Sequence, residues 1–383
     1  MKYLRDFLTN KTFLILAIIT LIPIFLHMRQ IEWPTLNSDE ASFAYNAYSI
    51  LETGRDEYGT LFPARFKAFG ENKLPVTVYT ILPSIALFGL NESAARLPFI
   101  LIGILSPIMF FALCRKLTGN ATIGLIAAFL ASISPWIQIM SRHIHENIII
   151  LALVMGMLWY LIDLHKKVTV KTLAILALLV GVSLFTYHIG KVLAIFVLLW
   201  VAYFIVARKE YQHFLKISLI VFAIPLILFG ITEFINPSSR ISNLFLTSAP
   251  GFQASIQQQR AEHDNKLLHN KLTYGATIAI QQYISYFSPE FLVRRGDSNI
   301  RFGFSGISPL TPVEYVFIFI GMYFMVKNKL EQRSLIISLL LLAPIPAALS
   351  WQEFSLTRSF ILIVPFILFI SYGLYHATLF FSH

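Results

Sequence analysis

Apolar runs of near-membrane length alternate with short polar segments along most of this chain. A helix that spans a bilayer needs about 20 consecutive apolar residues. The runs that approach this length lie at roughly 12–28, 97–114, 121–140, 147–164, 172–189, 192–207, 215–235, 313–326, 334–350 and 359–379. A further run, 75–90, is shorter and is interrupted by Pro83. The pattern predicts an all-α polytopic membrane protein with about ten transmembrane helices.

The basic residues indicate how the run 75–90 is placed. If it crosses the membrane, Arg115-Lys116 and Arg208-Lys209 fall outside the cell. If it lies along the outer surface as an interfacial helix, the segments that become cytoplasmic each hold two or three Lys or Arg: the N-terminus, 115–120, 165–171, 208–216 and 327–333. Because short cytoplasmic loops are enriched in Lys and Arg, the second arrangement is favoured. It predicts both termini in the cytoplasm and two long external loops, 29–96 and 236–312.

These loops divide the chain into three parts. A transmembrane module, 1–235, contains the first external loop; an external loop subdomain covers 236–312; C-terminal transmembrane helices follow at 313–383. Within the subdomain, Phe252–Leu272 is polar and rich in Gln, which predicts a solvated helix. The stretch Tyr274–Phe291 interleaves aromatic and polar residues, which suits a segment lying among the lipid headgroups.

Composition supports a membrane location. Of the 383 residues, 56% are hydrophobic and 13% are charged, whereas soluble domains carry about 25% charged residues. The formal net charge of +10 is spread over short loops, so we expect no nucleic-acid partner. No small-residue cleavage site follows the first apolar run, so we expect an uncleaved first helix in the cytoplasmic (plasma) membrane. Cys114 is the one cysteine of the sequence, which excludes an intramolecular disulfide.

Asp39 and Glu40 are the first candidates for chemistry. They lie about ten residues beyond the first apolar run, close to the predicted outer face of the bilayer. The following stretch, Ala41–Leu51, has apolar periodicity, so both acids are predicted to begin a helix, whose N-terminal dipole favours negative charge. A general base must lie within hydrogen-bond reach of the proton that it takes. The sequence therefore favours proton chemistry by this pair over two merely solvated acids.

The external connection Ser141–Asn147 is dense in polar side chains. It holds Arg142, His143, His145 and Glu146. With Asp39 and Glu40 these groups could form a site for Mg²⁺ or Mn²⁺, in which Asp39 and Glu146 would be the ligands. The alternative is a solvated connector in which Glu146 begins the next helix, with Glu146 or Arg142 helping an active site.

Several cations fall on the predicted outer side, and they are candidates for binding a phosphate. A departing phosphate needs positive charge aimed at its oxygens, although cations at helix ends also extend towards lipid headgroups. The candidates are Lys73, Arg96, Arg142, Lys191, Arg301 and Arg358. Lys73 and Arg358 are flanked by polar, bent segments rather than plain helix ends. Tyr187 and His188 lie near Lys191 and could add hydrogen bonds there.

A nucleotide-dependent activity is not indicated. The sequence has no Gly-rich nucleotide loop of the Walker type, which argues against a sugar-nucleotide donor and an ATP-driven pump. The 34 Phe residues could line a groove for a polyprenyl tail, although such residues are also common on lipid-facing helices.

Several short motifs together resemble the GT-C superfamily of membrane glycosyltransferases, in particular its glycosyltransferase family 39-like branch. That branch includes the protein O-mannosyltransferases and the lipid A aminoarabinose transferases. The motifs are Asp39-Glu40-Ala41, Thr53-Gly54 with Tyr58-Gly59, Lys73-Leu74-Pro75, Arg96-Leu97-Pro98, the stretch Ser134–Asn147, and Pro344-Ile345-Pro346 with Arg358. The likeness covers nearly the whole chain and is strongest over 30–150.

The resemblance implies an inverting transfer of a sugar from a polyprenyl-phosphate carrier to an acceptor hydroxyl on the external face. It implies that Asp39 is the catalytic acid position with Glu40 beside it, and that Lys73 contacts the donor phosphate. Many relatives have Asp-x-Asp where this chain has His-Ile-His-Glu, which weakens the metal hypothesis. Acceptor recognition is expected in 236–312, since the sequence lacks the soluble C-terminal domain of some relatives. The acceptor itself, a protein, lipid or glycan, is left open.

Two other functions stay open from the sequence. One is a flippase or transporter of lipid-linked sugars, because Pro225, Pro344 and Pro365 could break helices. Charged residues nevertheless cluster at the ends of the apolar runs rather than at their centres. The other is a polymerase or ligase of lipid-linked glycans, which would use a longer glycan on a pyrophosphate carrier.

Overall fold

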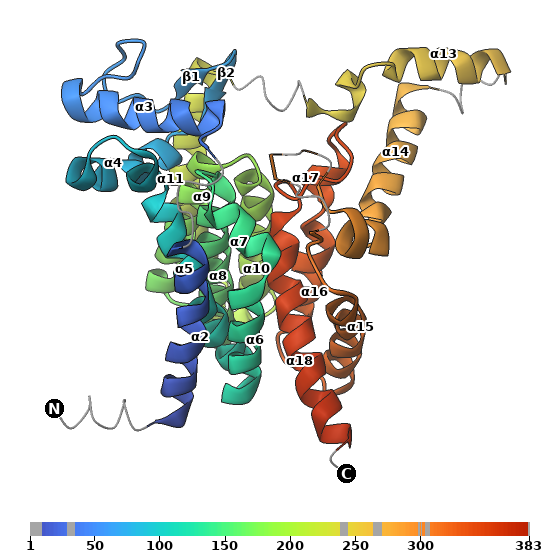
Figure 1. Ribbon diagram of the computed structural model, residues 1–383. Coiled ribbons are helices and arrows are strands. Elements are labelled where there is room, and N and C mark those ends of the chain that lie inside the picture. Colours follow the sequence, from blue (N-terminus) through green and yellow to red (C-terminus); the bar gives the residue numbers. More distant parts are fainter. Residues whose placement is uncertain are drawn as a thin grey trace.

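Helices run side by side through most of the computed structural model and form a bundle (Figure 1). The structure describes residues 10–28, 35–237, 244–262, 270–297, 299, 301–302 and 307–381. The helices of the bundle are α2 (Lys11–Met28), α5 (Glu92–Thr118), α6 (Ala121–Ile133), α7 (Pro135–Ser141), α8 (Glu146–Lys166), α9 (Val170–Thr186), α10 (Gly190–Val206), α11 (Phe214–Ile235), α15 (Pro312–Lys327), α16 (Arg333–Leu342), α17 (Ile345–Ala348) and α18 (Ile363–Phe381). Short 3₁₀ turns lie at Lys209–Tyr211, Leu246–Ser248 and Phe360–Leu362.

A second group of elements lies at one end of the bundle (Figure 1). It comprises α3 (Ser38–Thr53), β1 (Phe66–Ala68), β2 (Glu71–Lys73), α4 (Val76–Phe88), α13 (Phe252–Glu262) and α14 (Lys271–Ser285). Helix α2 starts and α18 ends at the opposite end of the bundle (Figure 1). The start of α2 and the end of α18 therefore lie on the same side of the bundle (Figure 1), as the predicted topology requires. Helix α4 lies beside α3 and across the end of the bundle, so the interfacial placement of 75–90 stays a prediction that this arrangement supports.

Capping residues decide where many of these helices begin. Asn91, Asn120 and Thr169 each precede a helix in an extended conformation and accept hydrogen bonds from its first backbone N–H groups. A helix leaves its first four N–H groups without partners in the helix, and such side chains satisfy some of them. The start of each of these helices is therefore set by the apolar run and by the capping residue that precedes it.

The run 121–140, which we expected to be one span, is broken. Helix α6 ends at Ile133, and α7 starts at Pro135 with an axis bent by 56°. Ser134 caps α7, and Pro135 occupies the first helical turn, where its missing N–H costs nothing. The break turns α7 towards the candidate site described below. Similarly, 334–350 consists of α16 and the short α17.

The predicted number of spans is not confirmed, although a helix covers most of each predicted run. Among the described residues, five helices are long and apolar enough to cross a membrane by themselves, or six if the bent pair α6–α7 counts as one span. Four shorter apolar helices are Val76–Phe88, Val170–Thr186, Gly190–Val206 and Arg333–Ala348. The chain is an integral membrane protein, and the figure of about ten spans remains an expectation from the apolar runs.

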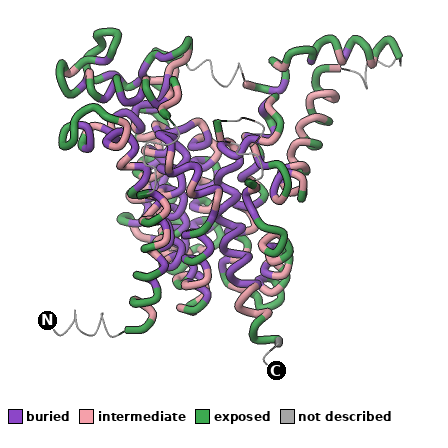
Figure 2. Tube along the Cα trace, viewed as in Figure 1, coloured by how far each residue is buried: buried purple, intermediate pink, exposed green. Residues whose placement is uncertain are grey.

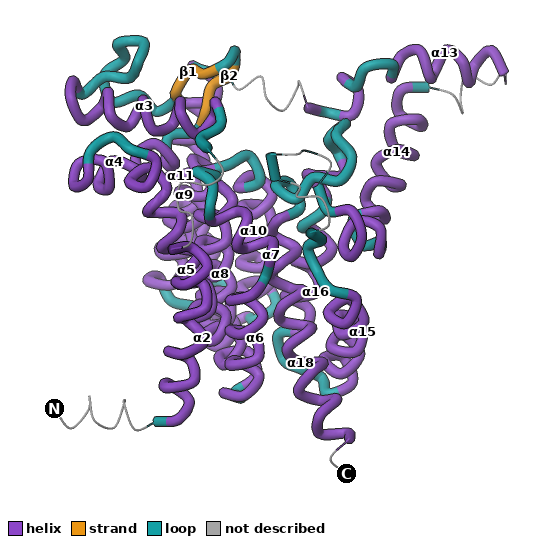
Figure 3. The backbone as a smooth tube through the Cα atoms, viewed as in Figure 1, coloured by secondary structure: helices purple, strands orange, loops and turns teal. Residues whose placement is uncertain are grey.

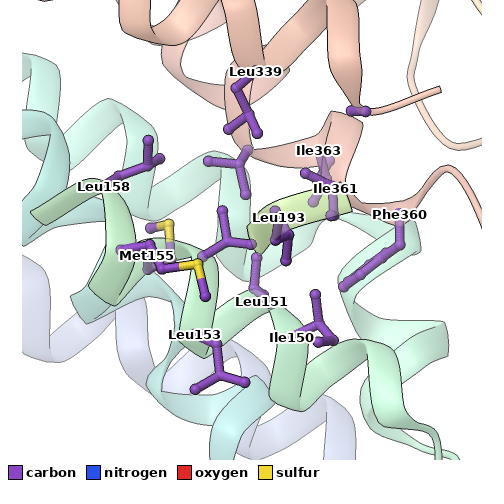
Figure 4. Packing of buried hydrophobic residues seen from close by; sticks show 14 of the residues in the cluster. Ile150, Leu151, Leu153, Met155, Leu158, Leu193, Leu339, Phe360, Ile361 and Ile363 are labelled. Atoms are coloured by element: carbon purple, nitrogen blue, oxygen red, sulfur yellow. The ribbon is translucent and has the colours of Figure 1, made fainter. Parts of the chain in front are cut away.

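The buried residues lie mainly in the centre of the helix bundle. Figure 2 shows buried positions through its centre and exposed ones along its outer helices and the projecting α13. Figure 4 shows the packing around α8, where Leu151, Met155 and Leu158 lie among side chains such as Leu193 and Ile361. Helix α11 instead exposes large apolar side chains along its length, at Leu219, Ile220, Ile224, Ile227, Leu228 and Ile231. Exposed apolar surface of this extent indicates contact with lipid.

The segment 236–312 contains helices, as the sequence predicted, but at shifted bounds. The solvated helix expected over 252–272 is α13, which ends at Glu262; residues 263–269 lie outside the described part of the chain. The segment expected at the headgroups is α14, which exposes Leu272, Ile280 and Ile284. Helix α13 projects away from the bundle, whereas α14 leads back to it and packs against α17 (Figure 1). Helix α11 ends at Ile235 and α15 starts at Pro312; the division of the chain into 1–235, 236–312 and 313–383 stays a prediction.

Candidate active site

A short hairpin, which the sequence analysis did not predict, brings Lys73 to Asp39. Strands β1 and β2 pair antiparallel, with Phe66 opposite Lys73. The connecting residues Phe69 and Gly70 both have positive φ, +50° and +78°, which matches the backbone twist of the preferred two-residue hairpin turns. Lys73 ends the hairpin with only 4% of its side chain exposed. The hairpin and the loops of this end are visible in Figure 3.

Asp39 lies in the first turn of α3, which a capping box fixes. Asn37 Oδ1 accepts hydrogen bonds from the N–H groups of Asp39 and Glu40, and the Glu40 carboxylate accepts one from the Asn37 N–H. The predicted helix start at the acidic pair is thereby confirmed. Because the cap fixes the backbone of this turn, the two adjacent carboxylates point in different directions and meet different surroundings.

The Asp39 carboxylate contacts two cations. Lys73 Nζ lies 2.9 Å from Oδ1, and Arg301 Nη1 lies 3.3 Å from Oδ2. The Lys73 ammonium also lies 4.3 Å from the centre of the Phe43 ring. The Asp39 and Arg301 side chains are about half exposed, at 47% and 50%. The structure thus places Asp39 and Lys73 together, with Arg301 of the segment 236–312 beside them.

Glu40 is enclosed instead. It is 1% exposed, and its two carboxylate oxygens accept hydrogen bonds from Arg96 Nε and Nη2, both at 3.1 Å. The backbone N–H of Ile144 adds a third at 2.9 Å. Arg96 is itself fully buried on α5. This fork-like pair ties α3 to α5 and to the connection before α8.

A polar cavity of about 140 Å³ joins these elements. Many of the residues that line it were candidates from the sequence: Asp39, Lys73, His143, His145, Glu146, Arg301 and Arg358. The lining also includes Asp297, Asn299, Gln352, Ser355 and Thr357, which the sequence analysis did not single out. The cavity therefore lies between the segment 29–96, the start of α8, the segment 236–312 and the segment before α18.

The two histidines of this cavity are held by backbone groups. His143 Nδ1 donates to the Ile139 carbonyl at 2.9 Å, which leaves Nε2 as an acceptor. Burial lowers the pKa of His143, so its imidazole is neutral at pH 7. His145 is the N-cap of α8, because its Nδ1 accepts the Asn147 N–H. The Phe302 ring lies edge-on to both imidazoles.

The segment before α18 carries Arg358, and buried polar groups from several helices hold it. Trp136 Nε1 donates to the Leu356 carbonyl at 3.1 Å, and Asn147 Nδ2 donates to the Thr357 carbonyl. The Ser355 N–H donates to the Tyr286 hydroxyl at 3.0 Å. None of these partners is near the segment in sequence, so periodicity could not reveal them. The bend between α6 and α7 is what places Trp136 here.

A second, mainly apolar cavity of about 240 Å³ lies next to the first, and Arg358 lines both. Its lining includes Tyr187, His188 and Lys191 from the α9–α10 connection, and apolar residues such as Leu244, Phe245 and Leu349. Arg358 Nη1 donates to Ser350 Oγ at 2.8 Å. A charged guanidinium thus lies where a polar and an apolar space meet.

Other predicted residues lie outside both cavity linings or are engaged elsewhere. Arg142 donates to the Leu26 carbonyl at the end of α2, and Arg96 is engaged with Glu40. Lys191 does line the apolar cavity, but its ammonium lies 3.7 Å from Glu233. Glu233 also pairs with the buried Arg65. Of the cations predicted to bind phosphate, some therefore line the cavities, whereas Arg96 and Arg142 bind groups outside them.

A metal site made from Asp39 and Glu146 does not fit this arrangement. Among the described residues, no group of three or more His, Cys, Asp and Glu side chains is placed to hold an ion. Both Asp39 oxygens face cations, and His145 Nδ1 is engaged by the Asn147 N–H. Divalent cations such as Mg²⁺ need several oxygen ligands converging on one point.

Comparison with known proteins shows the fold and a partial match to one family model. The family model of the dolichyl-phosphate-mannose-protein mannosyltransferases matches residues 72–232, which is less than half of the chain. The apo oligosaccharyltransferase of Archaeoglobus fulgidus superposes with a TM-score of 0.56 at 14% identity, covering 98% of this chain. Apo ArnT from Cupriavidus metallidurans gives 0.54 at 13% identity, covering 94%. The chain has the GT-C fold.

The chain spans about half the length of the solved structures that it matches: 51% of the oligosaccharyltransferase and 58% of ArnT. ArnT bound to undecaprenyl phosphate is a further match, with a TM-score of 0.51 at 13% identity, 94% of this chain and 58% of that chain. A search of curated proteins found no significant match.

Proposed function

We propose that this protein is a glycosyltransferase that moves a sugar from a polyprenyl-phosphate carrier to an acceptor hydroxyl on the external face of the cytoplasmic membrane. One observation carries the proposal. A polar cavity that contains the Asp39–Lys73 pair meets an apolar cavity at Arg358. A lipid-linked sugar has the matching order of parts: an apolar tail, a phosphate and a polar sugar.

In this proposal the donor lies across the two cavities. The first isoprene units occupy the apolar cavity, and the phosphate lies beside Arg358, within reach of Lys73 from the other side. Guanidinium groups bind phosphate through two parallel hydrogen bonds. The sugar extends into the polar cavity, where His143 Nε2 and Asn299 can bind its hydroxyl groups. Lys191 lies at the tail side and is placed for a supporting electrostatic role.

The transfer itself needs a base and a stabilised leaving group. Asp39 takes the proton of the acceptor hydroxyl as its oxygen forms a bond to the anomeric carbon. The bond between that carbon and the phosphate oxygen breaks, and the lipid phosphate departs with the electron pair. Lys73 and Arg358 stabilise the negative charge that grows on the phosphate. Attack from the face opposite the leaving group inverts the anomeric centre.

The two cations at Asp39 differ in a way that suits this role. Lys73 is buried and fixes one oxygen, whereas the half-exposed pair with Arg301 is of a kind that contributes only about 0–1 kcal/mol. An acceptor hydroxyl can therefore replace Arg301 at Oδ2 at small cost. Glu40, saturated by Arg96 and Ile144, supports the turn that carries Asp39 rather than taking a proton. The steps are assigned to side chains alone, since the donor set does not fit a metal.

The relatives support the donor class. The matching family model describes mannosyltransferases that use a lipid phosphate donor, and one ArnT structure contains undecaprenyl phosphate. The oligosaccharyltransferase also has a structure in complex with dolichol phosphate. The sugar, hexose or pentose, and the acceptor, whether protein, lipid or glycan, follow from none of these.

Replacement of Asp39 tests the proposal. In proteoliposomes or native membranes supplied with labelled polyprenyl-phosphate sugars, Asp39→Asn is expected to lower transfer about 10²- to 10⁴-fold, the usual contribution of a positioned general base. The matched control is Glu52→Gln, an exposed acid on the same helix, which should keep full activity. Full activity of Asp39→Asn would refute the role. Movement of the label across the bilayer without covalent transfer would indicate a transporter instead.

A further inference from the structure

Asp297, in the second external loop, binds backbone groups of two separate segments. Its Oδ2 accepts the Leu356 N–H at 2.7 Å, and its Oδ1 accepts the Asn299 N–H at 2.7 Å. The Thr357 N–H is a further donor to this carboxylate. One side chain thus joins the loop that carries Arg301 to the segment that carries Arg358.

Both segments lack regular secondary structure and need such support. The turn into Ser355–Arg358 passes through Phe354 at φ +51°, a strained conformation for a bulky residue. Neutral groups hold other parts of this segment, but Asp297 places a carboxylate against its N–H groups and near Arg358. Charge-assisted hydrogen bonds of this kind are stronger than neutral ones.

We propose that Asp297 is a positioning residue for donor binding. By holding the two segments together, it keeps Arg358 at the junction of the cavities while Arg301 stays beside Asp39. Its carboxylate touches no reacting atom and acts through the backbone of Leu356 and Thr357. The inference rests on the proposed function, because it assigns Arg358 to the donor phosphate.

A pH dependence follows from the same contacts. Burial raises the pKa of the Asp297 carboxyl, while the N–H donors and Arg358 oppose the rise. A carboxyl with a raised pKa takes up its proton at a higher pH than an ordinary aspartate. Once protonated, it accepts hydrogen bonds from these N–H groups poorly. Donor binding should therefore weaken as the pH falls through the raised pKa of Asp297.

Further charged and titratable groups surround Asp297. Burial raises the pKa of Tyr286 to about 12 and lowers that of His143, so both stay neutral near pH 7. His145, Glu146, Glu353 and Arg301 also face this region, so the pH profile must be compared between variants rather than read alone.

The experiment measures binding of undecaprenyl phosphate as well as transfer. For Asp297→Asn we expect the donor KM and the dissociation constant for undecaprenyl phosphate to rise about 10- to 100-fold. This is the size of effect that losing hydrogen bonds to a charged group usually has. The loss of affinity towards acidic pH, expected in the wild type, should disappear. kcat should change less, because Asp39 and Lys73 remain.

Two comparison variants separate positioning by charge from general loosening. Tyr286→Phe removes a neutral partner of the same segment, and it should weaken donor binding while keeping the wild-type pH profile. Glu290→Gln removes an acid of the same loop that pairs only with exposed arginines in the described part of the chain, and it should leave binding unchanged. If Asp297→Asn does not fold, the pH profiles of the wild type and Tyr286→Phe still carry the comparison.

The outcomes are distinct. Unchanged donor affinity and an unchanged pH profile in Asp297→Asn, with normal thermal stability, would overturn the inference. So would a wild type whose affinity does not weaken towards acidic pH. Suppose instead that the wild type binds undecaprenyl phosphate with an affinity that depends on Asp297 and yet transfers no sugar. That result would refute the proposed function and leave the inference standing. A wild type that does not bind the lipid phosphate would refute both.

Discussion

Asp39 and Glu40 are neighbours in sequence and opposites in environment. The Asp39 side chain is 47% exposed at the edge of a cavity, whereas Glu40 and Arg96 are 1% and 0% exposed. A carboxylate taken out of water must be paired and hydrogen-bonded, since the cost of desolvation is several kcal/mol per ion. Glu40 meets that condition with donors from Arg96, Ile144 and the Asn37 backbone, which makes it a structural anchor beside Asp39, the proposed base.

Removing one member of this buried pair should therefore be costly. We expect Glu40→Gln to destabilise the protein by about 3–5 kcal/mol, because the Arg96 charge remains buried without its partner. Thermal unfolding in detergent measures the effect. Arg301→Gln, which breaks a half-exposed pair, should cost no more than about 1 kcal/mol. Equal melting temperatures for Glu40→Gln and the wild type would contradict the anchoring role.

The sequence analysis selected Asp39, Lys73 and Arg358, and the structure places all three in the lining of one polar cavity. Their roles stay predictions. The residue pattern alone did not separate Asp39 from Glu40; only the resemblance did. The difference depends on Arg96, which is 56 residues away, and on a backbone N–H 104 residues away. Asp297 was not selected for the same reason, since its partner Leu356 lies 59 residues further along the chain.

At the scale of elements, close helix contact depends on small residues. Helices α15 and α18 approach so closely at Gly321 that an added Cβ would lie 1.8 Å from the Phe369 carbonyl oxygen. In membranes such small residues let backbones pack tightly without a hydrophobic driving force. The contact matters for the site because α18 closely follows the segment that carries Arg358.

Substitution at this contact gives a prediction with an internal control. Gly321→Ala should separate α15 from α18 and destabilise the protein by about 1–3 kcal/mol or more, the usual cost of overpacking. Gly230→Ala on α11 meets nothing within 4 Å, and it should be neutral or stabilise by up to about 1 kcal/mol, because alanine favours helix. Thermal unfolding of the two variants side by side provides the measurement. Equal effects would show that the α15–α18 contact is looser than the structure indicates.

The apolar runs and caps predicted most helices, but two features of the elements were missed. Nothing in the run 121–140 requires a 56° bend, although Ser134-Pro135 is a typical cap and first-turn pair. The hairpin at 66–73 is too short to show alternation, and its turn uses Phe69, a residue that rarely adopts positive φ. Both features lie at the candidate site, where tertiary contacts decide local conformation more than propensity does.

At the scale of the whole molecule, the two ends of the bundle are chemically different. The end with α3, α4 and the hairpin holds both cavities, whereas basic residues of the opposite loops bind helix ends. Arg208 donates to the carbonyls of Leu164 and His165, and Lys116 pairs with Asp163 at 2.7 Å. The residues that predicted the cytoplasmic side thus also fix the C-terminal end of α8.

This polarity makes the membrane orientation directly testable, because the sequence has a single cysteine that is buried. Cys114 is 1% exposed and contacts Ser371, so Cys114→Ala gives a cysteine-free background with little change of shape. In that background, cysteines are introduced at two exposed positions, Tyr58 after α3 and Lys209 after α10. In intact cells a membrane-impermeant maleimide should label Tyr58→Cys and not Lys209→Cys, since the positive-inside rule places the loop 208–216 in the cytoplasm. After permeabilisation both should react, which verifies that each thiol is accessible. Labelling of Lys209→Cys alone in intact cells would show that the topology is the reverse of the predicted one. Both cavities would then lie on the cytoplasmic side, where a donor carried on the external leaflet could not reach Asp39.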